Sequence, residues 1–132
     1  RSGIPITMAG LDVTEQALVF PEDFARIRAV NNPVASVVAD WLAFFYEFHR
    51  NIGYSGAPVH DAVAVAALIA PEIMKIEEMR VQIELQGDYC RGMTVGDRNQ
   101  LPGNASVITG IDRQAFVDLL VEAVKTYGEG SL

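Results

Sequence analysis

Hydrophobic positions in the first quarter of the chain change from a strand pattern to a helix pattern. Residues 4–13 are apolar or β-branched on both faces, which predicts a strand buried within a sheet. Pro5 fits only the start or the edge of that strand, because proline cannot donate a hydrogen bond to a neighbouring strand. Pro21, followed by two acidic residues, predicts a helix that runs to about Val30.

A second, longer helix is predicted after the break at residues 31–33. Its apolar residues recur at steps of three and four, which predicts one packed face made of Val34, Val37, Val38, Trp41, Phe45 and Phe48. At this spacing we expect Trp41 and the aromatic run 44–46 to belong to the core rather than to a ligand site. His49 falls near the end of this helix, where a partial positive charge is favourable.

The sequence beyond residue 60 predicts a third helix, three strands and a final helix. Residues 62–70 are apolar on all sides, so we expect a buried helix that Pro71 ends. Beyond it, apolar positions alternate with polar ones at Met79, Val81, Ile83 and Leu85, and residues 93–95 return as the partner strand of a hairpin. A short strand spans 105–111, and Asp112 then caps a helix whose core face is Phe116, Leu119, Leu120, Ala123, Val124 and Tyr127.

Composition narrows the class of protein. The chain has 132 residues, enough for one domain or part of one, and no apolar run reaches the ~18 residues of a membrane span. A net charge of −7 with ten scattered basic residues argues against nucleic acid or an anionic membrane as the main partner. Cys90 is the single cysteine and is expected to be a free residue of a turn. With no secretion signal recognised, we expect a cytoplasmic protein.

The stretch from Gly56 to Val65 carries the strongest candidate chemistry. It joins a loop to the third helix and places His60 and Asp61 at the helix start. One interpretation is structural, with Asp61 as a helix cap and His60 as a polar residue of a turn. The other is functional, because an imidazole and a carboxylate at the mouth of a buried helix are costly unless they are paired or used. In the preceding loop, Tyr54 could reach a ligand.

Four short stretches together resemble one enzyme family. Gly56-Ala-Pro-Val-His60-Asp61-Ala62 resembles the C-terminal part of the inosine/uridine-type nucleoside hydrolases, the nucleoside N-ribohydrolases. Three further stretches occur in the family's order, at residues 6–14 (ITMAGLDVT), 67–72 (ALIAPE) and 91–95 (RGMTV) with Asp97 close behind. The resemblance spans nearly the whole chain. Four matches in the family's order argue against an unrelated α/β domain with an accidental match.

The resemblance implies an α/β fold with an open, mainly parallel sheet, flanking helices and a small β-hairpin. Enzymes of this family hydrolyse the N-glycosidic bond of ribonucleosides, use a bound calcium ion and commonly form homo-oligomers. By resemblance, Asp61 matches the C-terminal calcium-ligand aspartate, and His60 matches the histidine that acts as general acid on the leaving base in the purine-active members of the family. Calcium takes oxygen ligands, so a carboxylate suits that role and an imidazole does not. Tyr54 is a candidate substrate contact.

The departure from the family pattern is also large. The family's aspartate-rich motif, D-x-D-x-G-x-D-D, does not occur here, nor do the asparagine- and glutamate-bearing loops that hold ribose. We therefore expect residues 1–132 to form the C-terminal part of a nucleoside hydrolase domain whose N-terminal half is absent. Alone, these residues are predicted neither to bind calcium tightly nor to hydrolyse nucleosides. The alternative is a non-catalytic scaffold that keeps the family's fold for assembly.

Overall fold

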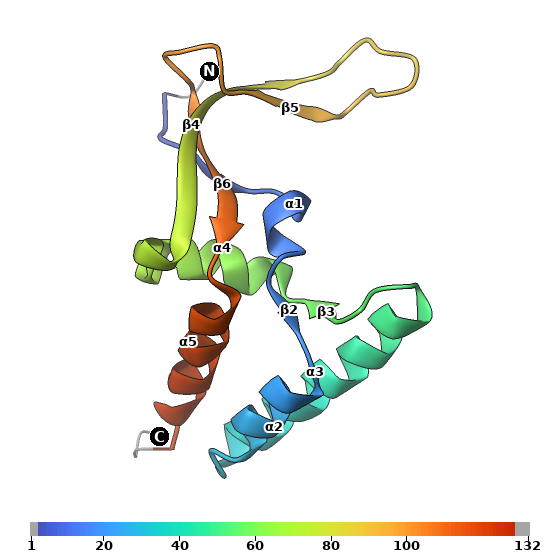
Figure 1. The fold of residues 1–132 in the computed structure, drawn as a ribbon, viewed down its shortest axis with the longest axis vertical. Coiled ribbons are helices and arrows are strands. Elements are labelled where there is room, and N and C mark those ends of the chain that lie inside the picture. Colours follow the sequence, from blue (N-terminus) through green and yellow to red (C-terminus); the bar gives the residue numbers. More distant parts are fainter. Residues whose placement is uncertain (1–2, 129–132) are drawn as a thin grey trace.

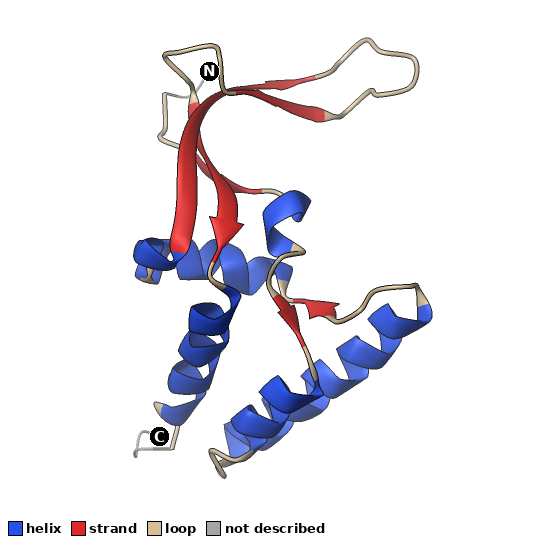
Figure 2. Cartoon of the chain, in the orientation of Figure 1, coloured by secondary structure: helices blue, strands red, loops and turns tan. Residues whose placement is uncertain are grey.

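The computed structural model describes residues 3–128 and contains a curled mixed sheet at one end and helices at the other (Figure 1). Figure 2 shows the same division by secondary structure. In chain order the elements are β1 (Thr7–Ala9), α1 (Leu11–Thr14), β2 (Leu18–Val19), α2 (Pro21–Arg28), α3 (Pro33–Asn51), β3 (Ala57–Pro58), α4 (His60–Ile69), the 3-10 helix η1 (Pro71–Ile73), β4 (Met74–Ile83), β5 (Thr94–Asp97), β6 (Ala105–Ile111) and α5 (Arg113–Lys125).

The main sheet has four strands in the order β1-β6-β4-β5. β1 pairs in parallel with β6, with Thr7 opposite Ser106, whereas β4 is antiparallel to both β6 and β5. A separate two-stranded sheet joins β2 to β3, with Val19 opposite Ala57. Within the described residues the sheet is therefore mixed, with one parallel pair and a hairpin that extends beyond the rest of the sheet (Figure 1).

The strand predictions hold best where the pattern is local. The hairpin is confirmed as β4 and β5, although β4 begins at Met74 and ends at Ile83 rather than spanning 79–85, and β6 has the predicted bounds. The strand predicted over residues 4–13 was wrong in extent, because β1 covers only Thr7–Ala9. The backbone carbonyl of Gly10 accepts hydrogen bonds from Val13 and Thr14, so the chain turns there into α1. β1 lies at a sheet edge, and the predicted burial on both faces does not occur.

The predicted core faces of α3 and α4 were also wrong. The buried residues of α3 are Ala35, Ala39 and His49, whereas Trp41 is 70% exposed and most of the predicted apolar face is exposed with it. α4 buries Val63 and Ala66 but leaves Val65, Leu68 and Ile69 exposed. Small side chains let α3 approach its neighbours closely, and that packing selects the alanine face. Val38 and Leu42 pack partly against this core, whereas Trp41, Phe44 and Phe48 are exposed.

α5 lies at the centre of the packing. Its residues contribute to all three apolar clusters, and each cluster joins α5 to a different part of the chain. Phe116 packs with Val63 and Ala66 of α4, and Val117 packs with the β2–β3 pair. The third cluster, with α2 and α3, consists of Val121, Val124, Ile27, Ala35 and Ala39. The predicted Asp112 cap is confirmed, because its Oδ1 accepts from the Ala115 N–H at 3.0 Å.

The predicted core face of α5 is confirmed only in part. Phe116 and Val124 are buried and Leu119 and Leu120 are half-buried, but Ala123 and Tyr127 are exposed. Among the residues that the structure describes, no helix is both long enough and apolar enough to cross a membrane.

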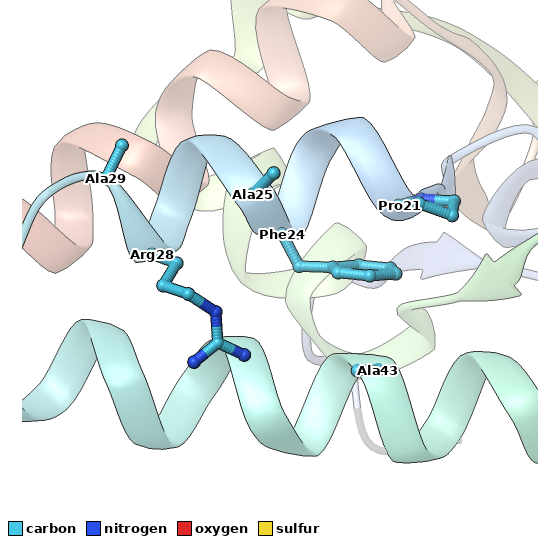
Figure 3. Close-up of a pocket in the computed structure, with 6 residues that line it drawn as sticks. All are labelled: Pro21, Phe24, Ala25, Arg28, Ala29 and Ala43. Atoms are coloured by element: carbon cyan, nitrogen blue, oxygen red, sulfur yellow. The ribbon is translucent and has the colours of Figure 1, made fainter.

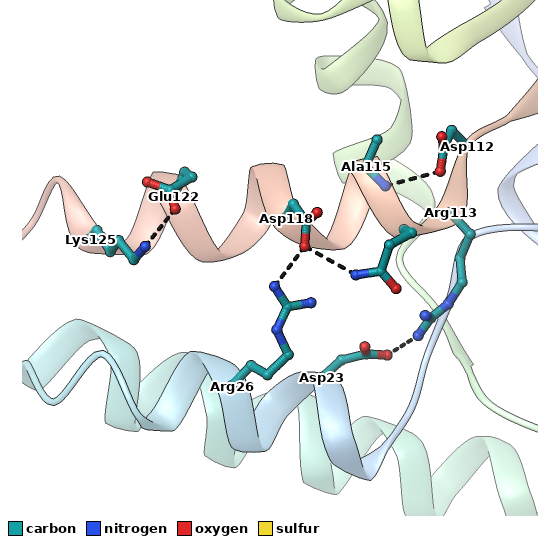
Figure 4. Close-up of polar contacts among 9 residues, drawn as sticks. Asp23, Arg26, Asp112, Arg113, Ala115, Asp118, Glu122 and Lys125 are labelled. Atoms are coloured by element: carbon teal, nitrogen blue, oxygen red, sulfur yellow. Dashed lines mark hydrogen bonds and ion pairs between the residues drawn. The ribbon is translucent and has the colours of Figure 1, made fainter.

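A buried carboxylate connects α2, β2 and the start of α5 (Figure 4). Asp23 is 2% exposed, and its Oδ2 accepts a hydrogen bond from the Phe20 N–H at 2.8 Å and another from the Arg113 guanidinium. Arg113 also donates from Nε to the Leu18 carbonyl at 2.8 Å, and its guanidinium carbon lies 5.0 Å from the centre of the Phe20 ring. The charges are paired and hydrogen-bonded, which a buried ion pair requires.

Removal of this carboxylate tests its role. We expect Asp23→Ala to lower the free energy of unfolding by about 3 kcal/mol, because Arg113 would lose its partner and the Phe20 N–H its acceptor. Urea denaturation of wild type and variant measures the change. Asp118→Ala is the matched control, since Asp118 pairs with Arg26 across the same two helices but is exposed (Figure 4). Equal losses in the two variants would contradict the assigned importance of the buried pair.

Candidate functional site

The candidate site lies at the start of α4. His60 and Asp61 are its first two residues, and Val59 occupies the N-cap position. A valine side chain cannot accept a hydrogen bond, so the interpretation of Asp61 as the cap residue is not supported. Asp61 instead lies in the first turn with an exposed side chain, while His60 is half-buried.

The loop before His60 is fixed by close backbone packing. Ala57 and Pro58 pair with β2, and both are buried. Gly56 sits so close to β2 that an added Cβ would lie 2.8 Å from the Phe20 ring and 3.0 Å from the Val19 carbonyl oxygen. Only glycine fits this approach without a shift of its neighbours. The direction in which the chain enters α4 therefore depends on the β2–β3 contact.

The closest polar partner of His60 comes from α1. Its Nδ1 lies 2.7 Å from the hydroxyl oxygen of Thr14, a residue 46 positions earlier in the chain. Thr14 is only 3% exposed, and its hydroxyl also lies 3.4 Å from the carbonyl oxygen of Leu11. Sequence reasoning placed Thr14 in a stretch that resembles the family but assigned it no role. No local pattern signals a contact between segments so far apart.

Tyr54 forms a hydrogen bond with Glu15, the residue that follows Thr14 in the chain. Its phenol donates to Glu15 Oε1 at 2.8 Å, and this carboxylate raises the pKa of Tyr54 above its ordinary value. Two of the predicted site residues therefore contact consecutive residues of the chain: His60 contacts Thr14, and Tyr54 contacts Glu15. The sequence contains no periodicity that would predict this convergence.

The second histidine has a structural position. His49 lies in the last turn of α3, as predicted, and its Nδ1 is 2.9 Å from the Phe45 carbonyl oxygen. Its ring is buried and packs edge-on against Phe45, Phe48 and Tyr54. His49 therefore supports the aromatic packing behind Tyr54.

The described residues do not form a metal centre of their own. Between residues 3 and 128, no group of three or more histidine, cysteine, aspartate or glutamate side chains could hold a metal ion. Cys90 is free and exposed, in agreement with its predicted place in a turn. A calcium ion requires about six to eight oxygen ligands, so Asp61 could supply only part of such a site.

Two hollows formed by the described residues lie away from the predicted site residues. One of about 510 Å³ lies between α2 and α3 and is lined by Pro21, Phe24, Ala25, Arg28, Ala29 and Ala43 (Figure 3). Arg28, at its edge, is held by an ion pair with Asp40 at 2.7 Å. A second hollow of about 430 Å³ lies between β1–α1 and the β4–β5 hairpin and includes Asp12, Arg98 and Thr109. Neither hollow includes His60, Asp61 or Tyr54 in its lining.

Sequence comparisons identify the relatives of this chain. The family model for inosine-uridine preferring nucleoside hydrolase matches residues 1–118. The pyrimidine-specific ribonucleoside hydrolase RihA of Shewanella woodyi is 50% identical over 132 residues, and the protein of the same name from Escherichia fergusonii is 48% identical. Each match covers 96% of this chain and 42% of the relative. The chain therefore spans less than half the length of these relatives.

Solved structures of nucleoside hydrolases also match this chain. A purine-preferring ribonucleoside hydrolase from Gardnerella vaginalis matches with a TM-score of 0.81 at 29% identity, over 96% of this chain and 41% of that one. The plant nucleoside hydrolase PpNRh1 matches with a TM-score of 0.78 at 21% identity, over 93% of this chain and 42% of that one. The second likeness concerns the fold alone.

The predicted fold is thereby confirmed as a fragment of the nucleoside hydrolase α/β fold. The resemblance inferred from four short stretches is confirmed over most of the chain, and an accidental match is excluded. The chain belongs to the inosine-uridine preferring nucleoside hydrolase family.

Proposed function

We propose that the protein to which these residues belong hydrolyses the N-glycosidic bond of ribonucleosides to give a free base and ribose. The observation that carries this proposal is the ~50% identity to ribonucleoside hydrolases over 96% of the chain. For the base we propose a pyrimidine, because the relatives at 48–52% identity are named as pyrimidine-specific. The purine-preferring structure is more distant, at 29% identity.

His60 is proposed as the general acid of this reaction. When the bond between ribose C1′ and the base nitrogen breaks, the electron pair goes to the base, which is a poor leaving group unless it is protonated. A proton from the His60 ring would neutralise that charge as it develops. Water adds to C1′ and gives one proton to the solvent, from which His60 regains its own. The half-buried position of His60 and its fixed Nδ1 contact support this role, because a general acid must be held in one orientation.

Asp61 is proposed to contribute one carboxylate to a calcium site of the complete protein. When bound, calcium would supply positive charge for holding ribose hydroxyls and water. The exposed carboxylate in the first turn of α4 supports this placement, since within residues 3–128 it takes part in none of the ion pairs that occupy other acids. The described residues form no group of three or more potential metal ligands, so the other ligands of this site would come from the rest of the complete protein.

Three further expectations stay predictions. They are that residues 1–132 form the C-terminal part of the domain, that the protein forms a homo-oligomer and that it is cytoplasmic.

Activity of two variants tests the proposed roles. In the longest reading frame that contains this segment, we expect His60→Ala to lower kcat for uridine by about 10²- to 10⁴-fold, the contribution of a general acid. Hydrolysis of p-nitrophenyl riboside should change far less, because p-nitrophenolate leaves without protonation. Asp61→Ala should impair both substrates, since the ribose is common to them.

The control for these variants is Asp40→Ala, which removes an exposed acid on α3 away from the candidate site. It should leave both activities unchanged. A parent protein that hydrolyses neither substrate, or one that is indifferent to changes at His60 and Asp61, would contradict the enzyme hypothesis. The alternative, a non-catalytic scaffold, would then account for the large apolar side chains exposed on α3.

Calcium titration tests the second proposal. The isolated 132-residue chain should show no micromolar binding of calcium by isothermal titration calorimetry, because a single carboxylate provides too few of the ligands that calcium requires. The complete protein should bind calcium, and Asp61→Ala should weaken that binding. Micromolar binding to the isolated chain would contradict the proposal.

A further inference from the structure

We propose that Thr14 is a positioning residue that fixes the ring orientation and the tautomer of His60. This inference rests on the proposed role of His60 as general acid. It is carried by the 2.7 Å separation of Thr14 Oγ1 and His60 Nδ1, and by the 3% exposure of Thr14. A hydrogen bond of this length in a water-poor position determines which way the imidazole ring faces.

The second partner of the hydroxyl favours one direction of the bond between Thr14 and His60. Thr14 Oγ1 also lies 3.4 Å from the Leu11 carbonyl oxygen, which can only accept. With the hydroxyl hydrogen directed to Leu11, Oγ1 accepts from His60 Nδ1–H. The ring nitrogen that remains for a contact with the leaving base is then Nε2. This arrangement suits a general acid, because Thr14 can accept from Nδ1–H both before and after Nε2 gives its proton to the base.

The support behind Thr14 is rigid. Its backbone N–H donates to the Gly10 carbonyl at 3.1 Å, and the adjacent Val13 is fully buried. Threonine is also β-branched, so few side-chain rotamers are open to it. The hydroxyl is therefore held in place before His60 contacts it. Positioning by a rigid second residue is the arrangement that keeps a reacting group in its productive geometry.

The next residue adds an independent contact in the same place. Glu15, at the end of α1, accepts a hydrogen bond from Tyr54, the predicted substrate contact. One turn of chain therefore contacts both His60, the proposed general acid, and Tyr54, the predicted substrate contact. α1 is short, and its buried residues are Val13 and Thr14. Through Thr14 and Glu15, this short helix positions the side chains of His60 and Tyr54.

Three variants of the complete protein test the proposal. Thr14→Val keeps the shape of the side chain and removes the hydroxyl, and Thr14→Ser keeps the hydroxyl. The control, Thr126→Val, removes an exposed hydroxyl that donates to the Ala123 carbonyl at the end of α5. We expect Thr14→Val to lower kcat for uridine about tenfold, the effect of one lost hydrogen bond, with KM nearly unchanged. Activity on p-nitrophenyl riboside should be retained, Thr14→Ser should restore most of kcat, and Thr126→Val should match wild type.

A nitrogen-15 NMR spectrum gives a readout that does not depend on activity. The resonances of His60 are assigned by their loss in His60→Ala. In the wild type the neutral ring should be protonated at Nδ1, and Thr14→Val should give a mixture of tautomers. An unchanged tautomer in Thr14→Val would overturn the proposal.

The kinetic outcomes separate this proposal from the function on which it rests. Equal losses on both substrates would assign Thr14 a purely structural role and overturn the proposal. An active wild type with an unimpaired Thr14→Val variant would overturn the positioning role alone. A wild type that hydrolyses neither substrate would overturn the proposed function, and the positioning role with it.

Discussion

Burial of one face of α5 is the constraint on which the rest of the structure depends. That face contacts α4 through Phe116, the β2–β3 pair through Val117, and α2 and α3 through Val121 and Val124. The Asp23–Arg113 ion pair holds the start of the helix against β2 and α2. Both contacts fix the elements that lead into α4. The position of His60 is therefore a consequence of packing some distance away from it.

Much of the fold follows from local sequence signals. β6, the β4–β5 hairpin and the Asp112 cap of α5 were predicted because alternation, turn residues and a cap are encoded within a few positions. α3 shows where such reasoning stops. This helix has two apolar faces, one of small residues around Ala35 and Ala39 and one of large residues around Trp41. Periodicity identifies a face but not what covers it, and the small face is the one that packs.

The candidate site divides in the same way. His60 and Asp61 were found because they lie within one short motif, and the structure places them together at the start of α4. Thr14 could not be found, because its contact with His60 joins segments 46 residues apart. The link between Tyr54 and Glu15 spans 39 residues and was missed for the same reason. Residues that perform chemistry can be recognised from a short sequence motif, whereas the residues that hold them in place become visible only in the tertiary structure.

The central claim is that this segment contributes His60 and Asp61 to the active site of a ribonucleoside hydrolase. The most direct test is a crystal structure of the complete protein with calcium and an unreactive uridine analogue. The account predicts His60 Nε2 within hydrogen-bond reach of the base, at about 3 Å, and an Asp61 oxygen bound to the metal. A structure with the nucleoside bound elsewhere, or with both side chains directed away from it, would contradict the account.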